Sequence, residues 1–243
     1  MSTVTVLMEC ISDLHVGSGE TNFHVIDNEV EKDPVTGYPM IHSSGLKGAL
    51  RAFSEQTDSN LRSAVNDIFG SSIESSRSKG KLKFLSAEMI ALPKRASKGP
   101  EPYYLVSTKR AVERYWSMKS ILSGKSESSK EVDCSDEGKA AEGIDLALKT
   151  EIEGRTVYLV DESSFREMDL SVVARNCLEN GISKNLWYEE LVPHGAIFAF
   201  HIIADSAFEL LDLFADEIDG KCIQFGGGAT IGYGLCRLTV LRG

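Results

Sequence analysis

Residues 196–242 decide the fold: AIFAFHIIADSAFELLDLFADEIDGKCIQFGGGATIGYGLCRLTVLR. The first of them, 196–204, are apolar on both alternating faces, which predicts a strand in the middle of a sheet. A helix is predicted next, over 205–218, and residues 220–242 predict a strand, a glycine-rich turn and another strand. The apolar side chains of the helix are spaced four, three and four residues apart, as one buried face requires: Ala207, Leu211, Phe214 and Ile218.

The N-terminal part of the chain predicts a similar order of elements. Residues 3–12 alternate between two faces and indicate a strand, whereas 17–41 hold the glycines and prolines of a loop or an irregular hairpin. Ser43 or Ser44 is expected to cap a helix that runs to about residue 57. The apolar stripe of this helix follows the spacing of one buried face: Leu46, Ala49, Leu50 and Phe53.

Two strand–helix–strand units with an insertion between them define the fold class. Residues 80–92 complete the first unit as a strand with a bulge near Ser86. The insertion holds a predicted helix at 107–122 and a segment, 123–143, in which large apolar residues are too few to predict order. We therefore expect an α+β fold with a ferredoxin-like core, a modified form of the RNA-recognition motif, and an irregular loop after the first strand.

The domain organisation follows from the length and from this order. A chain of 243 residues suits one domain that carries an insertion. We expect a single domain over 1–243. Its core covers about 1–93 and 195–243, and its insertion covers about 94–194.

The composition limits where the protein acts and what it binds. The five cysteines lack the CxxC spacing of a zinc knuckle, and the N-terminus lacks the pattern of a signal peptide. With no apolar run long enough to cross a bilayer, we expect a cytoplasmic protein without a membrane partner. The net charge of −10 argues against a free-standing RNA binder. Six of the carboxylates lie in 205–220, however, so a local cationic groove remains compatible with this charge.

The segment 224–238, QFGGGATIGYGLCRL, contains five glycines within the nine residues 226–234, which we call the glycine loop. Glycine adopts a positive φ without strain and lets another backbone approach closely. Exposed N–H groups in such loops bind anions. The loop lacks the GK[ST] of a P-loop, and a strand follows it rather than a helix, so dinucleotide binding is not indicated.

Five blocks of the sequence form a recognisable set. They are the glycine loop before a final strand, LHVGSG at 14–19, VIDNEVEKDPVTGYPMIHSSGLKGALR at 25–51, KGKLKFLSAEMIALPKR at 79–95 and NLWYEELVPHGAIF at 185–198. Taken together, these blocks resemble the RAMP superfamily, and within it the repeated backbone subunit of type III-B (Cmr) CRISPR effector complexes. In the block at 79–95, Ser86 stands where the family often has aspartate.

The resemblance implies an RNA-guided endoribonuclease. Copies of such a subunit stack along a CRISPR guide RNA together with other Cmr subunits. A thumb within the insertion projects into the guide–target duplex, and the complementary single-stranded target RNA is cut at regular intervals. Asp27 matches the family's catalytic loop aspartate, and the reaction depends on Mg²⁺ or another divalent cation. A loop carboxylate suits this, because Mg²⁺ binds a few carboxylates and completes its shell with water and phosphate.

A second catalytic candidate is His15, because histidine exchanges protons near neutral pH. The simpler interpretation is a histidine at the end of a strand that is satisfied by the backbone or by RNA. Glu29, Glu31 and Asp33 could add to a metal site, although an acidic run is more often only solvated.

The residues expected to hold the guide RNA lie in two places. Ser43 and Ser44 present N–H groups at a helix start, where the helix dipole favours phosphate, and Lys47 and Arg51 add positive charge beside them. The alternative is an ordinary cationic surface helix. The glycine loop is expected to lie against this helix and to contribute Gly226, Gly227, Gly228, Thr230 and Gly232.

Three further RNA contacts are candidates. Trp187 is able to stack on a base, as is Tyr188, although both also suit packing at the base of the thumb. Lys109 and Arg110 lie on the predicted helix at 107–122 and are candidates for phosphate contacts.

Other functions are open at this point. They are the equivalent subunit of the type III-A (Csm) complex, an RNA-binding scaffold without chemistry, and a stand-alone enzyme that uses the glycine loop for a nucleotide. The LWYEE block favours Cmr over Csm.

Overall fold

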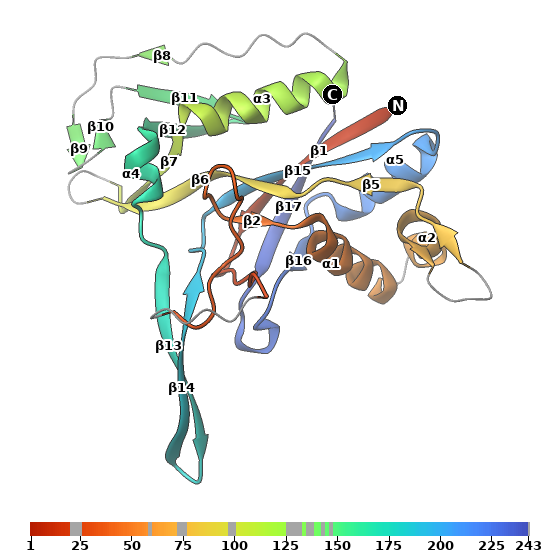
Figure 1. The fold of residues 1–243 in the computed structure, drawn as a ribbon. Helices are drawn as coiled ribbons and strands as arrows, with labels where there is room; N and C mark the ends of the chain where they lie inside the picture. The colour runs from red at the N-terminus through yellow and green to blue at the C-terminus, as the bar shows by residue number, and fades with distance from the viewer. Residues whose placement is uncertain are drawn as a thin grey trace.

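The core of the molecule is a sheet in which the strands lie in the order β17–β1–β15–β6, each pair antiparallel (Figure 1). Numbered along the chain, this is the order 4-1-3-2, which two split β-α-β units produce, and the predicted ferredoxin-like fold is confirmed. These strands are β1 (Ser2–Cys10), β6 (Ala87–Arg95), β15 (Ile197–Ala204) and β17 (Leu235–Arg242). The computed structural model describes residues 1–19, 26–57, 60–71, 77–96, 101–124, 133–134, 139–141, 144–145 and 148–242.

One face of this sheet is covered by helices and carries the larger apolar core (Figure 1). Leu46 and Leu50 of the first helix are fully buried, as the apolar stripe predicted. The rings of Phe69, Phe84 and Phe214 join the helices to the sheet, with centroids 5.3–5.8 Å apart. The helices on this side are α1 (Ser43–Gln56), α2 (Asn60–Phe69) and α5 (Phe208–Ile218). The short strands β5 (Leu82–Phe84) and β16 (Cys222–Gln224) belong to the sheet itself, where they pair with β15 and β17. Strands β3 (Gly70–Ser71) and β4 (Ser78–Lys79) pair with each other separately.

The segment between β6 and β15 extends the same sheet and covers its other face. Strands β7, β12, β11 and β8 continue the sheet beyond β6, and α3 packs on the face away from α1 and α2 (Figure 1). The elements here are β7 (Tyr103–Thr108), α3 (Lys109–Ser123), β8 (Asp133–Cys134), β9 (Lys139–Ala141), β10 (Ile144–Asp145), β11 (Leu148–Ile152), β12 (Arg155–Val160) and α4 (Glu162–Arg166). Of the segment 123–143, for which the composition predicts no order, residues 125–132, 135–138 and 142–143 lie outside the described residues.

A long hairpin, β13 (Ser171–Glu179) with β14 (Ile182–Leu191), projects away from the sheet (Figure 1). Asn180 and Gly181 form its turn with φ angles of 52° and 78°, the geometry of a two-residue type I′ turn. The outer part of β14 is exposed, and its last residues, Glu190 and Leu191, are buried at the base.

The predicted elements agree with the structure except at helix starts. The strand at 80–92 is interrupted at residues 85–86, as the bulge near Ser86 predicted. The cap prediction was wrong: α1 begins at Ser43, its N-cap is His42, and no side chain caps it within its own segment. Instead, Ser86 Oγ accepts the Ser43 amide at 3.2 Å, so the cap comes from the residue just before β6. Ala207 precedes α5 rather than belonging to it.

Two smaller observations complete the fold. The four cysteines with described side chains, Cys10, Cys177, Cys222 and Cys236, are all free thiols. Among the helices of the described residues, none has the length and apolarity needed to cross a membrane.

Candidate nucleic-acid interface

The glycine loop is pressed against the chain that follows β1. Gly226 has a φ of +69°, and a Cβ added there would lie 2.1 Å from the carbonyl oxygen of His15. The Gly227 amide donates to that same oxygen at 2.9 Å. At the other end of the loop, a Cβ on Gly234 would lie 1.9 Å from the Phe225 oxygen. Close backbone approach therefore requires glycine at both ends of the loop.

His15 is held by the base of the hairpin. Its Nδ1 lies 2.8 Å from the carbonyl oxygen of Glu190 in β14. Because a carbonyl oxygen only accepts, Nδ1 carries the proton, and Nε2 of the neutral ring is left with its lone pair. A Cβ on Gly17 would lie 3.1 Å from Nε2, so this glycine leaves room beside the free nitrogen.

Asp27 is fastened to the same strand. Its Oδ2 accepts the Tyr188 amide at 2.8 Å, and its own amide donates to the Tyr188 oxygen at 3.1 Å. The residue is half-buried, and its Oδ1 has no hydrogen-bond partner among the described residues. Next to it, Asn28 accepts the Glu190 amide at 2.9 Å.

The edge of β14 that does not pair with β13 thus binds the segments around His15 and Asp27, both of which are distant from β14 in sequence. Tyr188 and Glu190 present their amides and carbonyls at this edge, one to the segment around Asp27 and the other to Asn28 and His15. The Glu190 carboxylate secures the arrangement, because it accepts the Val30 amide at 3.1 Å and pairs with Lys32 Nζ at 3.1 Å. The structure therefore brings together His15, Asp27 and the glycine loop.

Two of the neighbouring acids, Asp33 and Glu31, are occupied by local contacts. Burial acts to raise the pKa of Asp33, but hydrogen bonds from Thr36 and Val35 outweigh it and hold the pKa below its usual value. Glu31 lies 3.2 Å from His42 Nε2. Within the described residues no group of three or more His, Cys, Asp or Glu side chains is arranged to hold a metal ion.

The start of α1 presents donors to solvent. Ser44 and Gly45 are exposed, and their amides have no acceptor among the described residues. Lys47 is half-buried and has no hydrogen bond or ion pair in the part of the chain that the structure describes. Helix α1 packs against β16, the strand that leads into the glycine loop, so these donors and the loop belong to adjacent elements (Figure 1).

Arg51 differs from Lys47, because its guanidinium is used inside the fold. Its Nη1 donates to the Gly70 oxygen at 2.8 Å, and its Nε donates to Glu55 at 2.8 Å. Asn66 accepts a third hydrogen bond from Nη2 at 3.4 Å. Arg51 thus ties α1 to α2 and β3.

The aromatic residues of the hairpin lie on different faces. Trp187 is half-buried and lies under the Arg175 guanidinium, whereas Tyr188 on the opposite face is exposed. Arg175 also lies over the ring of Tyr233 in the glycine loop. Arg175 and Tyr233 received no role from sequence reasoning. The Asn-Gly turn between two alternating runs was the available signal for this hairpin.

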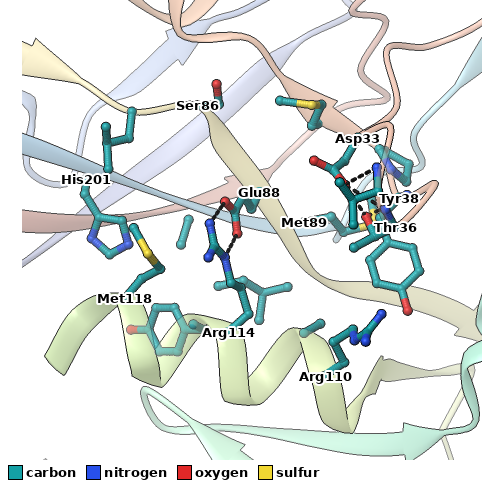
Figure 2. A pocket seen from close by; sticks show the side chains of 18 residues that line it. Asp33, Thr36, Tyr38, Ser86, Glu88, Met89, Arg110, Arg114, Met118 and His201 are labelled. Atoms are coloured by element: carbon teal, nitrogen blue, oxygen red, sulfur yellow. Dashed lines mark hydrogen bonds and ion pairs between the residues drawn. The ribbon is translucent and has the colours of Figure 1, made fainter. Parts of the chain in front are cut away.

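Lys109 and Arg110 lie away from this interface. Both are on α3, on the other face of the sheet from α1. Lys109 lies 3.8 Å from Glu113. Arg110 borders a pocket of about 680 Å³ between α3, β6 and the loop before β2 (Met40–Ile41), where Arg114 and Glu88 form a two-bond ion pair (Figure 2).

His201 lines the same pocket and is expected to make stability depend on pH. Burial lowers its pKa from 6.5 to about 4, with nearby Arg114 and Lys119 acting in the same direction and Glu88 against it. In the unfolded chain the residue takes up a proton near pH 6.5. The contribution of neutral His201 to the free energy of unfolding is therefore complete above pH 6.5. As the pH falls toward 4, this free energy decreases by roughly 3 kcal/mol at most.

This pH effect is measured by urea unfolding at pH 7 and pH 4.5. His201→Gln is expected to lose roughly 2 kcal/mol less stability between these values than the wild type. His194→Gln is the control, because it makes the same substitution at a histidine whose side chain is 75% exposed rather than buried. Equal pH dependence in wild type and His201→Gln would contradict the assignment.

Comparison with known proteins places this geometry in a family. A model of the RAMP superfamily matches residues 7–237. The chain is 24% identical over 287 residues to the CRISPR system Cmr endoribonuclease Cmr4 of Pyrococcus furiosus, covering 99% of this chain and 96% of that protein. It is 32% identical over 89 residues to the CRISPR system CMR subunit Cmr4 of Saccharolobus solfataricus, covering 37% of this chain and 28% of that one.

Solved structures resemble it over the same extent. A chain of a type III-B Cmr-β complex bound to cognate target RNA matches with a TM-score of 0.80 and 23% identity, covering 99% of this chain and 97% of that one. Oligomeric Cmr4 from Pyrococcus furiosus matches with a TM-score of 0.73 and 21% identity, covering 100% and 99%. Because the family model spans nearly the whole chain, the protein is a member of the RAMP superfamily.

Proposed function

We propose that this chain is a repeated backbone subunit of a type III-B CRISPR ribonucleoprotein in the cytoplasm. It holds guide RNA by the phosphate backbone, stacks with copies of itself and other Cmr subunits, and cuts paired target RNA at regular intervals. The similarity to Cmr4 over the whole chain supports the assembly. The observation that carries the nuclease activity is that Asp27 and His15 meet along one edge of β14, with the glycine loop bonded to the His15 carbonyl.

The side chains at this edge suit the cleavage of RNA by its own 2′-hydroxyl. In that reaction the hydroxyl loses a proton, a bond forms between O2′ and phosphorus, and the P–O5′ bond breaks as O5′ takes up a proton. Nε2 of His15 bears a lone pair and is suited to accept the first proton. The free Oδ1 of Asp27 places negative charge next to the edge at which the phosphate would lie.

The residues present fit a weakly held divalent cation. Asp27 offers one carboxylate oxygen that has no partner among the described residues, and the nearby Asp33 and Glu31 are engaged elsewhere. Mg²⁺ commonly binds one or two carboxylates and fills its remaining positions with water and substrate phosphate. When bound, such an ion would neutralise charge on the scissile phosphate.

Phosphate binding is proposed for the start of α1 and the glycine loop. The amides of Ser44 and Gly45, which have no acceptor in the part of the chain that the structure describes, stand at the positive end of a helix dipole, with Lys47 one turn inside it. Such contacts recognise the phosphate backbone without reading bases.

Lys47→Ala is expected to weaken guide-RNA binding by about five- to tenfold, equally for unrelated guide sequences. The reason is that Lys47 has no protein partner in the described structure and is free to neutralise a phosphate. The slope of log affinity against log salt concentration should fall by about one. The measurement is a salt titration of RNA binding by the assembled complex.

Arg51→Ala is the matched comparison on the same helix. Because Arg51 bonds Gly70, Glu55 and Asn66, its loss should lower the free energy of unfolding by about 1–2 kcal/mol. Its effect on the salt slope should be smaller than that of Lys47→Ala. The reverse ranking of the two slopes would contradict a phosphate contact by Lys47.

A further inference from the structure

The β13–β14 hairpin projects far from the sheet, so a small rotation at its base produces a large displacement at its far end (Figure 1). Strand β13 has nine residues, which corresponds to about 30 Å. A swing of about 10° at the base would move the far end by about 5 Å, more than the ~3.4 Å between successive nucleotides of one strand. A two-stranded hairpin is marginally stable without further packing. Its angle against the body of the protein therefore has to be set by additional contacts.

Arg175 makes such a contact part of the way along the hairpin. It pairs across the hairpin with Trp187, and its guanidinium carbon lies 5.8 Å from the centroid of the Trp187 ring. Nη1 lies 3.2 Å from Glu189 Oε2, and the other oxygen of this carboxylate accepts the indole N–H of Trp187 at 2.8 Å. The charge of Arg175 is thus balanced within the hairpin, and the side chain is only 28% exposed.

The same guanidinium reaches the glycine loop. Its carbon lies 5.8 Å from the centroid of the Tyr233 ring. Tyr233 is held in the loop, because its amide donates to the Gly228 oxygen at 3.2 Å and its ring lies against Gly228, where a Cβ would meet Cδ2 at 2.7 Å. Arg175 therefore lies over an aromatic ring of the hairpin and over one of the glycine loop, and a planar guanidinium suits such contacts.

The Arg175 contact adds a second connection between the hairpin and the glycine loop, which are already linked through His15. The glycine loop is bonded to the His15 oxygen, His15 is bonded to Glu190 at the hairpin base, and Asp27 is bonded to Tyr188 on the same strand. Within the described residues, Arg175 provides the side-chain link between the hairpin and the loop that returns to His15. Movement of the hairpin relative to the loop would have to break it.

We infer that Arg175 is a positioning residue that locks the angle of the β13–β14 hairpin against the glycine loop and thereby selects which phosphate of the paired RNA stands at Asp27. The inference rests on the proposed function, since it concerns the register of the cut. Arg175 acts through Tyr233 and Trp187 rather than by touching the RNA, because Glu189 already neutralises its charge.

The test is a map of cut positions. The complex is assembled with wild-type protein, with Arg175→Lys or with Arg175→Gln, and end-labelled target RNA is resolved at single-nucleotide resolution. For both variants we expect products displaced by about one nucleotide, in amounts comparable to the main product, whereas the wild type cuts at one position per interval. Lysine should fail to rescue, because it keeps the charge but lacks the planar guanidinium that lies over both rings.

Two controls show whether the displaced cuts come from the Arg175 contact itself. Lys184→Gln removes a cation from the same hairpin, where Lys184 pairs with Glu179 at 3.1 Å, and it should leave the cut positions unchanged. Hydrogen exchange of the assembled complex should show faster exchange in β13 and β14 for Arg175→Lys, with the core strands unchanged. This second readout does not depend on cleavage.

The outcomes separate the inference from the function on which it rests. Full rescue by Arg175→Lys would show that charge alone matters and would overturn the positioning role. Unchanged cut positions in both Arg175 variants, in a complex whose wild type cleaves, would also overturn it and leave the proposed function standing. A wild-type complex that binds target RNA without cutting it would overturn the proposed function, and the inference with it.

Discussion

Asp27→Asn is expected to abolish target cleavage while guide and target RNA remain bound. Asparagine has the same size, and its side-chain oxygen is able to accept the Tyr188 amide as Oδ2 does now, so the loop at the edge of β14 should keep its place. What is lost is the negative charge at the free oxygen, which the proposed reaction uses next to the scissile phosphate. We expect a fall of at least ~10²-fold in the single-turnover rate.

The control for this substitution removes a carboxylate elsewhere. Asp212 lies exposed on α5, and among the described residues it pairs only with Arg242, at 4.0 Å, so Asp212→Asn should cleave at the wild-type rate. Chelation of divalent ions should lower the wild-type rate to that of Asp27→Asn and leave Asp27→Asn unchanged. A wild-type rate for Asp27→Asn would end the catalytic assignment, and a loss of RNA binding with the activity would move Asp27 to a binding role.

Gly226→Ala is expected to destabilise the protein by at least about 3 kcal/mol. The residue has a φ of +69°, which an alanine adopts only with strain, and the new Cβ would lie 2.1 Å from the His15 oxygen. One of the two backbones would have to move, and the hydrogen bond from the Gly227 amide to that oxygen would be lost. The midpoint of denaturant unfolding measures this effect.

Gly232→Ala is the matched control in the same loop. Gly232 has a φ of +85°, yet a Cβ there would meet no atom within 4 Å. Only the strain of the backbone angle applies, and we expect a loss of about 1 kcal/mol. If both variants lost the same stability, the close approach to His15 would not be what holds the loop.

Much of the fold could be predicted because it depends on local periodicity. The alternation of residues 3–12 predicted β1, and the both-faced apolar run at 196–204 predicted the central β15. The α1 stripe predicted the burial of Leu46 and Leu50. These patterns record which face of an element avoids water, and that preference is written in side-chain type.

The sequence predicted the individual residues of the candidate site but not how they come together. His15, Asp27 and the glycine loop were singled out from the chain, but their meeting place on β14 was not. From the sequence, Arg51 and Lys47 are equivalent cations on one helix. Only the hydrogen bond from Arg51 to Gly70, nineteen positions away, shows that the Arg51 guanidinium is used inside the fold.

By itself, the sequence determined the two split β-α-β units, the glycine-dependent close approach and the types of side chain available for chemistry. Only the tertiary structure decided that segments separated by 161 and 175 positions lie together on one strand edge. The physical reason is that main-chain groups help to make these contacts, through the Glu190 carbonyl and the Tyr188 amide. Every residue except proline carries the same backbone N–H and C=O pair. The residue types at positions 188 and 190 therefore do not predict that their main-chain groups bind Asp27 and His15.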